Sequence, residues 1–144
     1  MLISARDIET ISAVLGKPEE STTNSWFWNI RNTETKAVLA LTVSDGVDVG
    51  NGEPTMIVAA QTYQGYIELH DVTGFCVIDP DEVMFITKRE ETFSCLVVGA
   101  SCTCSQFSNV RTSLLKAELT EIDPAALMAA MQLQLAESLI ETLP

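Results

Sequence analysis

The sequence predicts an α+β domain: an antiparallel β-sheet of about five to seven strands, flanked by an N-terminal and a C-terminal α-helix. Two observations predict it. Apolar residues recur at helical spacing near the two ends of the chain, and between the ends short apolar runs are separated by turn-forming residues. Because helices do not alternate with strands, a parallel doubly wound sheet is disfavoured. The 144 residues, 47% hydrophobic and 19% charged, are predicted to form a single globular domain over 1–144.

The first helix is predicted over residues 5–15. Ser4 is a typical N-cap residue, and Asp7, three positions later, completes a capping-box-like pair. The apolar residues that follow at helical spacing are Ile8, Ile11 and Leu15. Gly16 suits the left-handed position after a helix, and Pro18 prevents the helix from continuing.

The middle of the chain is predicted to form strands, because its apolar runs are short, rich in β-branched and aromatic residues and bounded by turn signals. These segments are 26–30, 37–43, 55–62, 66–71, 75–78, 83–87 and 93–98. In the first of them Trp26, Trp28 and Ile30 alternate, so we expect that face to be core beneath a helix. The segment 37–43 is apolar on both faces, which is typical of an interior strand covered on both sides.

Two stretches carry weaker local signals. Residues 44–54 hold three glycines and several acids and are predicted to be a loop. For residues 101–121 the sequence allows two elements without deciding between them and a loop: a strand near 102–107 and a helical turn near 113–118.

The last helix is predicted over about 124–142, with Asp123 as its cap and Pro124 in its first turn. Its apolar residues lie on two sides: Leu127, Met131 and Leu135 on one, Leu133 and Ile140 on another. A single sheet covers one side only. We therefore expect a homodimer whose interface includes Leu127, Met131, Leu133 and Ile140, the alternative being that the first helix covers the second side within one molecule.

The chain carries 20 acidic and 8 basic residues, a formal net charge of −12. Nucleic acid and anionic membranes are disfavoured as partners, because both attract basic surfaces, whereas a basic protein is favoured. No signal peptide or apolar run long enough to span a membrane is evident, so we expect a cytoplasmic protein.

Few residues suggest chemistry. His70 is the only histidine, and Asp71, its neighbour on a predicted strand, is expected to point to the opposite face. Cys102 and Cys104 suggest a metal or thiol site that Cys76, Cys95 or His70 would complete through the fold, although buried, reduced cysteines without metal are expected. Asp45, Asp48, Asn51 and Glu53 offer oxygen ligands for calcium, but their spacing fits no EF-hand and a solvated loop is favoured.

These observations favour a non-enzymatic protein-interaction module without a cofactor, acting as a homodimer. The order of helix, strands and helix resembles, in layout alone, the small acidic dimeric chaperones of secretion effectors, which implies a chaperone-like role. No motif carries this resemblance, and the second helix expected between strands of that family is not evident in 63–83. The alternative function is a small enzyme or a metal or thiol protein that uses His70 and the cysteines.

Overall fold

A computed structural model describes residues 3–48, 50, 52–78 and 80–111. Within them the chain forms one helix and nine strands. In order, these are α1 (Ala5–Leu15), β1 (Glu20–Ser21), β2 (Ser25–Arg31), β3 (Val38–Asp48), β4 (Pro54–Thr62), β5 (Gly65–Leu69), β6 (Gly74–Ile78), β7 (Glu82–Lys88), β8 (Thr92–Gly99) and β9 (Cys104–Arg111).

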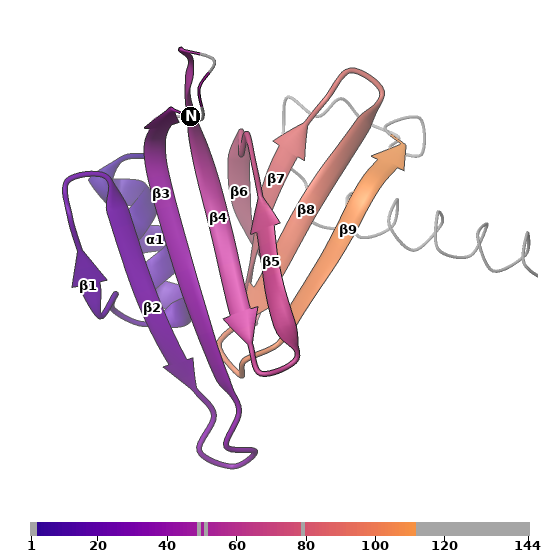
Figure 1. Cartoon of the computed structure of the whole chain (residues 1–144). Helices are drawn as coiled ribbons and strands as arrows, with labels where there is room; N and C mark the ends of the chain where they lie inside the picture. Colours follow the sequence, from indigo (N-terminus) through magenta and orange to yellow (C-terminus); the bar gives the residue numbers. More distant parts are fainter. Residues whose placement is uncertain (1–2, 49, 51, 79, 112–144) are drawn as a thin grey trace, which may run out of the picture.

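The strands form two antiparallel sheets whose spatial order follows the chain (Figure 1). The first sheet contains β1 to β5 and the second contains β6 to β9. The antiparallel α+β prediction is thus confirmed in outline, but the expected five to seven strands in one sheet are wrong. The short β1 has no apolar pattern to reveal it, and nothing local in residues 70–73 signals that the chain leaves one sheet for another.

The first helix forms as predicted. The Ser4 hydroxyl accepts a hydrogen bond from the Asp7 amide, and the Asp7 carboxylate accepts one from the Ser4 amide, which completes a capping box. Gly16 ends the helix at φ +88°, a conformation that favours glycine, and its amide donates to the Ser12 carbonyl. No helix in the described part of the chain is long and apolar enough to cross a membrane.

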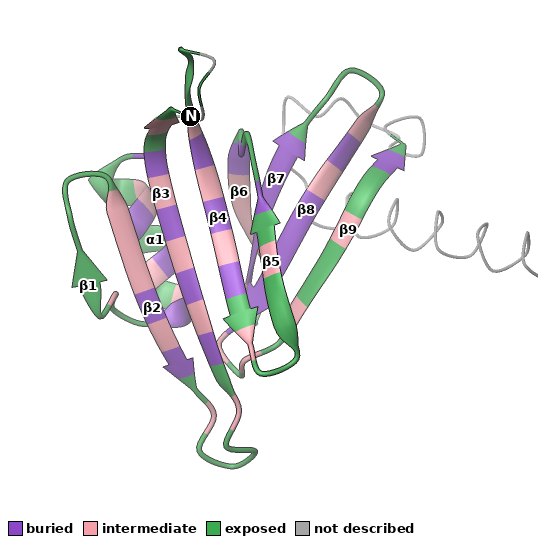
Figure 2. Ribbon diagram, viewed as in Figure 1, coloured by how far each residue is buried: buried purple, intermediate pink, exposed green. Residues whose placement is uncertain are grey.

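The main core lies between the first sheet and a layer made of α1 and the second sheet. Figure 1 shows α1 behind β2 and β3, and β6 behind β4 and β5. Buried side chains of this core come from α1, from β2 to β5, and from β7 and β8; they include Ile11, Trp28, Leu39, Leu41, Val43, Met56, Val58, Phe85, Leu96 and Val98. Alternate residues of β2, β3 and β4 are buried, as Figure 2 shows, whereas β7 is buried along most of its length. The first sheet therefore uses one face for this core, and the second sheet has two apolar faces.

Trp28 joins the first sheet to α1. Its side chain is 1% exposed, and its indole Nε1 donates to the Gly16 carbonyl at the end of α1, at 2.8 Å. The indole thus fills the core and also satisfies a carbonyl that the helix leaves without an intrahelical partner. Ile30 is buried and Trp26 packs against the same core, so the predicted core face beneath a helix is confirmed.

The predicted loop over 44–54 is wrong in its first half, because β3 continues to Asp48. A β-bulge between Ser44 and Val47 lets the strand carry Asp45, which is 5% exposed, with Gly46 at φ +68° beside it. The Asp45 carboxylate accepts hydrogen bonds from the amides of Ile3 and Gly46. These bonds compensate for burying a charge and tie the start of the chain to β3.

The end of the chain was predicted less well. A strand was expected near 102–107, and β9 occupies 104–111 instead. The expected helical turn near 113–118, the helix over 124–142 and the proposed interface residues lie outside the described residues. Only one of the two flanking helices is therefore confirmed.

Replacing Trp28 by Ala is expected to lower the free energy of unfolding by about 3–5 kcal/mol, because it leaves a large cavity. Trp28→Phe keeps most of the volume but loses the hydrogen bond to Gly16, and the loss of that bond alone contributes about 1 kcal/mol. Urea unfolding measures both changes. Tyr63→Ala is the control: Tyr63 is 85% exposed, so its removal is expected to change stability by less than about 0.5 kcal/mol. A loss below about 1 kcal/mol for Trp28→Ala would contradict the central role of this side chain.

Candidate functional site

The face of the first sheet that points away from the core carries a mixture of short polar, apolar and aromatic side chains with a few longer polar ones; we call it the open face. Cross-strand partners in an antiparallel sheet place their side chains on the same face. One such row crosses all five strands and consists of Glu20, Phe27, Thr42, Ala59 and Glu68. A carboxylate lies at each end of the row, and an aromatic ring and two small side chains lie between them.

The neighbouring rows extend this pattern. One contains Ser25, Ser44 and Ile57, and the other contains Asn29, Ala40, Gln61 and Tyr66. Together the rows enclose a shallow depression of about 340 Å³ on the open face. Small side chains of β3 and β4 line the depression, and Tyr66 of β5, which is 57% exposed, lines it as well.

The open face departs from what the sequence predicts for β3. Because the strand is apolar on both faces, the sequence indicated cover on both sides; Leu39, Leu41 and Val43 are fully buried, whereas Ala40 and Thr42 are only partly buried. Within the described residues, no helix or sheet packs on Ala40 and Thr42. β3 is an interior strand as predicted, since it is the central strand of its sheet, but the described residues cover only one of its faces.

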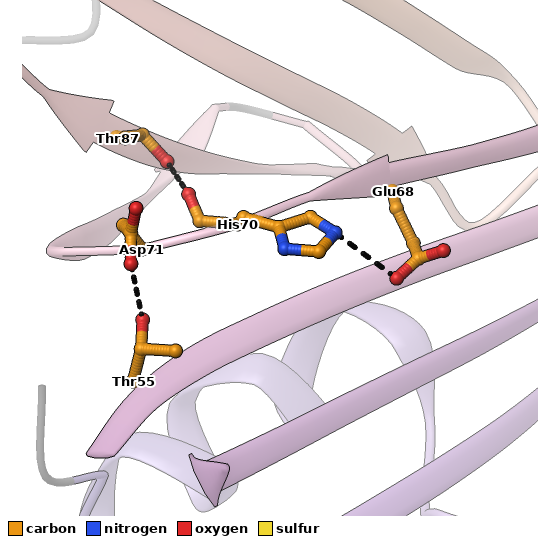
Figure 3. A network of polar contacts seen from close by, with 5 residues as sticks. All are labelled: Thr55, Glu68, His70, Asp71 and Thr87. Carbon is orange, nitrogen blue, oxygen red and sulfur yellow. Dashed lines mark hydrogen bonds and ion pairs between the residues drawn. The ribbon is translucent and has the colours of Figure 1, made fainter. Parts of the chain in front are cut away.

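Glu68 organises the polar groups at the β5 end of this face. Its Oε1 lies 3.1 Å from Nε2 of His70, as Figure 3 shows. Partial desolvation raises the pKa of the Tyr66 phenol, and the hydrogen bond to Glu68 and the negative charge of Glu68 raise it further. Tyr66 therefore stays a neutral hydroxyl across the physiological range.

His70 lies just beyond the end of β5, with its side chain 51% exposed. Asp71 does not contact its ring: the Asp71 carboxylate accepts a hydrogen bond from Thr55 Oγ1 at 2.9 Å (Figure 3). The Thr87 hydroxyl donates to the His70 backbone carbonyl at 2.6 Å, which fixes the backbone but leaves the ring free to turn toward Glu68. Among the five residues drawn in Figure 3, the exposed Glu68 carboxylate is the one with a marked contact to the imidazole.

The second sheet separates the four cysteines into two pairs. All four are thiols. Cys102 and Cys104 pack against the core between the two sheets, whereas Cys76 and Cys95 belong to a second apolar cluster made by the second sheet. The sequence had left open that Cys76 or Cys95 completes a site around Cys102 and Cys104. Since the body of a sheet lies between the pairs, the fold does not bring them together.

Cys102 precedes β9 and has φ +71°, so it lies in a turn rather than on the strand expected from the sequence. Its thiol donates to the carbonyls of Ile30 and Ala37, at 3.3 and 3.5 Å. Cys102 and Cys104 both line a pocket of about 370 Å³ that also includes Gly65, at the start of β5. Burial raises the pKa of both thiols, which lowers their reactivity at neutral pH.

A thiol–imidazole pair is not assembled either. The pocket of Cys102 and Cys104 extends along β5 from Gly65 to Ile67, and His70 follows the end of that strand. At about 3.3 Å per residue, the three steps from Ile67 to His70 span roughly 10 Å. This is far beyond hydrogen-bond reach.

The acidic segment does not form a cation site in the described part of the chain. The buried Asp45 carboxylate is occupied by backbone amides, and Asp48 Oδ1 accepts hydrogen bonds from the amides of Gly50 and Gly52. No group of three or more His, Cys, Asp or Glu side chains able to hold a metal ion occurs among the described residues. Asn51 lies outside them.

No family model, no curated protein and no solved structure matches the chain. The layout resemblance to secretion chaperones therefore gains no support from relatives, and the open face has to be interpreted from its own geometry.

Burial raises the pKa of the Cys95 thiol to about 12, against roughly 8.5 for an exposed thiol. Between these two values the folded state keeps a proton that the unfolded chain has lost. The contribution of this group to stability is thus fully present below about pH 8.5 and is lost as the pH rises toward 12. Urea unfolding near pH 7.5 and near pH 10 is expected to show a larger loss for the wild type than for Cys95→Ala, in which this titration is absent. Equal losses in the two proteins would show that Cys95 is not buried in solution.

Proposed function

We propose that the protein is a non-enzymatic interaction module that binds a basic segment of another protein on the open face of its first sheet. The observation that carries this proposal is the row from Glu20 to Glu68, in which small and apolar side chains lie between two carboxylates. Apolar area supplies affinity when water leaves it, and flanking carboxylates select cationic side chains.

The shape of the open face suits a helical segment. Ala40, Thr42 and Ala59 are short, so a partner backbone is able to approach the sheet closely over β3 and β4. Phe27 and Tyr66 stand on either side and offer aromatic contact, the side-chain type most often found at binding hot spots. An amphipathic helix with apolar residues on one face and lysines beside them matches this arrangement. The chain's net charge of −12 also favours encounter with a basic partner.

The rival function, a small enzyme or metal protein using His70 and the cysteines, lacks such support. Its candidate groups lie on opposite faces of the second sheet, or are separated along β5 by more than hydrogen-bond reach.

The proposal includes a homodimer and, from the layout of helix and strands, a chaperone-like role in holding the bound segment. Its basis is the sequence: the predicted helix near 124–142 has a second apolar side, with Leu133 and Ile140. Burying such side chains against a second copy is the commonest way to remove them from water.

Thr42→Arg is expected to abolish binding on the open face, because it places a long cation on the floor of the depression. The probe is a synthetic amphipathic helix of about 18 residues with leucines on one face and lysines on the other. Isothermal titration is expected to show binding to the wild type that weakens with salt, and a Kd at least about tenfold higher for Thr42→Arg.

Thr33→Arg is the matched control, since Thr33 is exposed in the turn between β2 and β3 and the charge change is the same. It is expected to keep the wild-type Kd within about twofold. Equal weakening by both variants would mean that net charge alone attracts the peptide. Binding of a peptide with glutamates in place of the lysines, as tight as the original, would contradict the proposed selectivity.

Sedimentation tests the homodimer. The wild type is expected to sediment as a dimer at micromolar concentration, and the Leu133→Glu, Ile140→Glu double variant as a folded monomer, because burying two carboxylates disfavours the interface. A monomeric wild type contradicts the dimer. If the double variant stays a folded dimer, the interface lies elsewhere. If it unfolds, Leu133 and Ile140 belong to the core of one molecule.

A further inference from the structure

The second sheet has an apolar face that points away from the first sheet; we call it the far face. Its buried side chains are Met84, Ile86, Phe93, Cys95, Val97 and Val110, each at most 5% exposed. Cys76, Ile78 and Phe107 pack beside them. Side chains on a bare sheet face are not buried to this degree, so another part of a polypeptide covers them.

The cover does not come from the described elements. Every described member of this cluster belongs to β6, β7, β8 or β9 themselves. α1 does contact β7, but its buried residues Ile8, Ile11 and Leu15 pack in the core between the sheets, together with Val83 and Phe85 on the opposite side of β7.

We infer that the chain's own segment after Arg111 covers the far face, with the side of the predicted helix that carries Leu127, Met131 and Leu135 packed on it. The segment starts at the right place, because Arg111 ends β9, the strand at the border of the same sheet. The 12 residues from 112 to 123 reach up to about 40 Å, so they do not restrict where the helix lies. A helix over the 19 residues 124–142 is about 28 Å long and spans four strands spaced about 4.8 Å apart.

This inference divides the two apolar sides of the predicted helix between two tasks. Leu127 and Met131, which the sequence analysis places in the dimer interface, then pack on the far face of their own chain, and Leu133 and Ile140 remain for a second copy. The inference does not depend on the open face, so binding of a basic peptide there neither supports nor contradicts it.

The alkylation rates of the native thiols show whether the far face is covered, because Cys76 and Cys95 lie on that face while Cys102 and Cys104 lie on the opposite face of the sheet. The experiment measures the rate of N-ethylmaleimide alkylation of each cysteine in the full chain by peptide mass spectrometry. In the Met131→Asp, Leu135→Asp variant, Cys95 is expected to react at least about tenfold faster, since the reaction follows the population in which the cover is open. Cys102 and Cys104 are expected to keep their wild-type rates.

Leu133→Asp, Ile140→Asp is the matched control on the other side of the helix, and Cys95 is expected to keep its rate within about twofold there. Unchanged Cys95 reactivity in the Met131→Asp, Leu135→Asp variant overturns the inference. If that variant exposes all four thiols because it unfolds, Met131→Ala replaces it: selective acceleration of Cys95 supports the inference, and an unchanged rate overturns it.

Dilution separates the chain's own segment from that of a second copy. A Cys95 rate that stays constant over a wide range of wild-type protein concentrations supports cover by the same chain. A rate that rises on dilution shows that the second copy supplies the cover, and overturns the inference.

Discussion

The structure depends on covering one apolar face of the first sheet. β3, its central strand, has 11 residues, about 36 Å of extended chain, whereas the 11 residues of α1 form a helix only about 16 Å long. A single helix is too short to remove this face from water. The second sheet covers what α1 leaves, and for this reason Val83, Phe85, Leu96 and Val98 join the α1 residues in one core.

The use of the second sheet as a cover has consequences on its other side. β7 and β8 are apolar on both faces, so the far face in turn needs protection. The same sheet separates Cys102 and Cys104 from Cys76 and Cys95, which prevents the four thiols from acting as one site. The packing therefore limits the chemistry: the four cysteines, which the sequence offers as members of one candidate site, lie on opposite faces of the second sheet.

The open face is another surface on which no described element packs. Its strands carry Ala and Thr where a solvent-exposed sheet usually carries long polar side chains. The carboxylates Glu20 and Glu68 lie at the two ends of its central row, and Glu68 also contacts His70 and Tyr66. A face of this composition gains more from a protein partner than from water, which is why binding rather than catalysis is the function proposed.

Short-range sequence signals specify the individual elements. The capping residues of the first helix, the turn at Gly16 and the alternation of Trp28 with its neighbours act within a few residues, so spacing alone predicts them. These signals do not determine β1, the continuation of β3 through the buried Asp45, the division into two sheets or the separation of the thiols. The candidate site was likewise missed, although one signal was present, the apolar character of 37–43 on both faces. These features depend on tertiary contacts, because strand pairing and layer packing are set by interactions between residues far apart in the chain, whose free energies no local pattern contains.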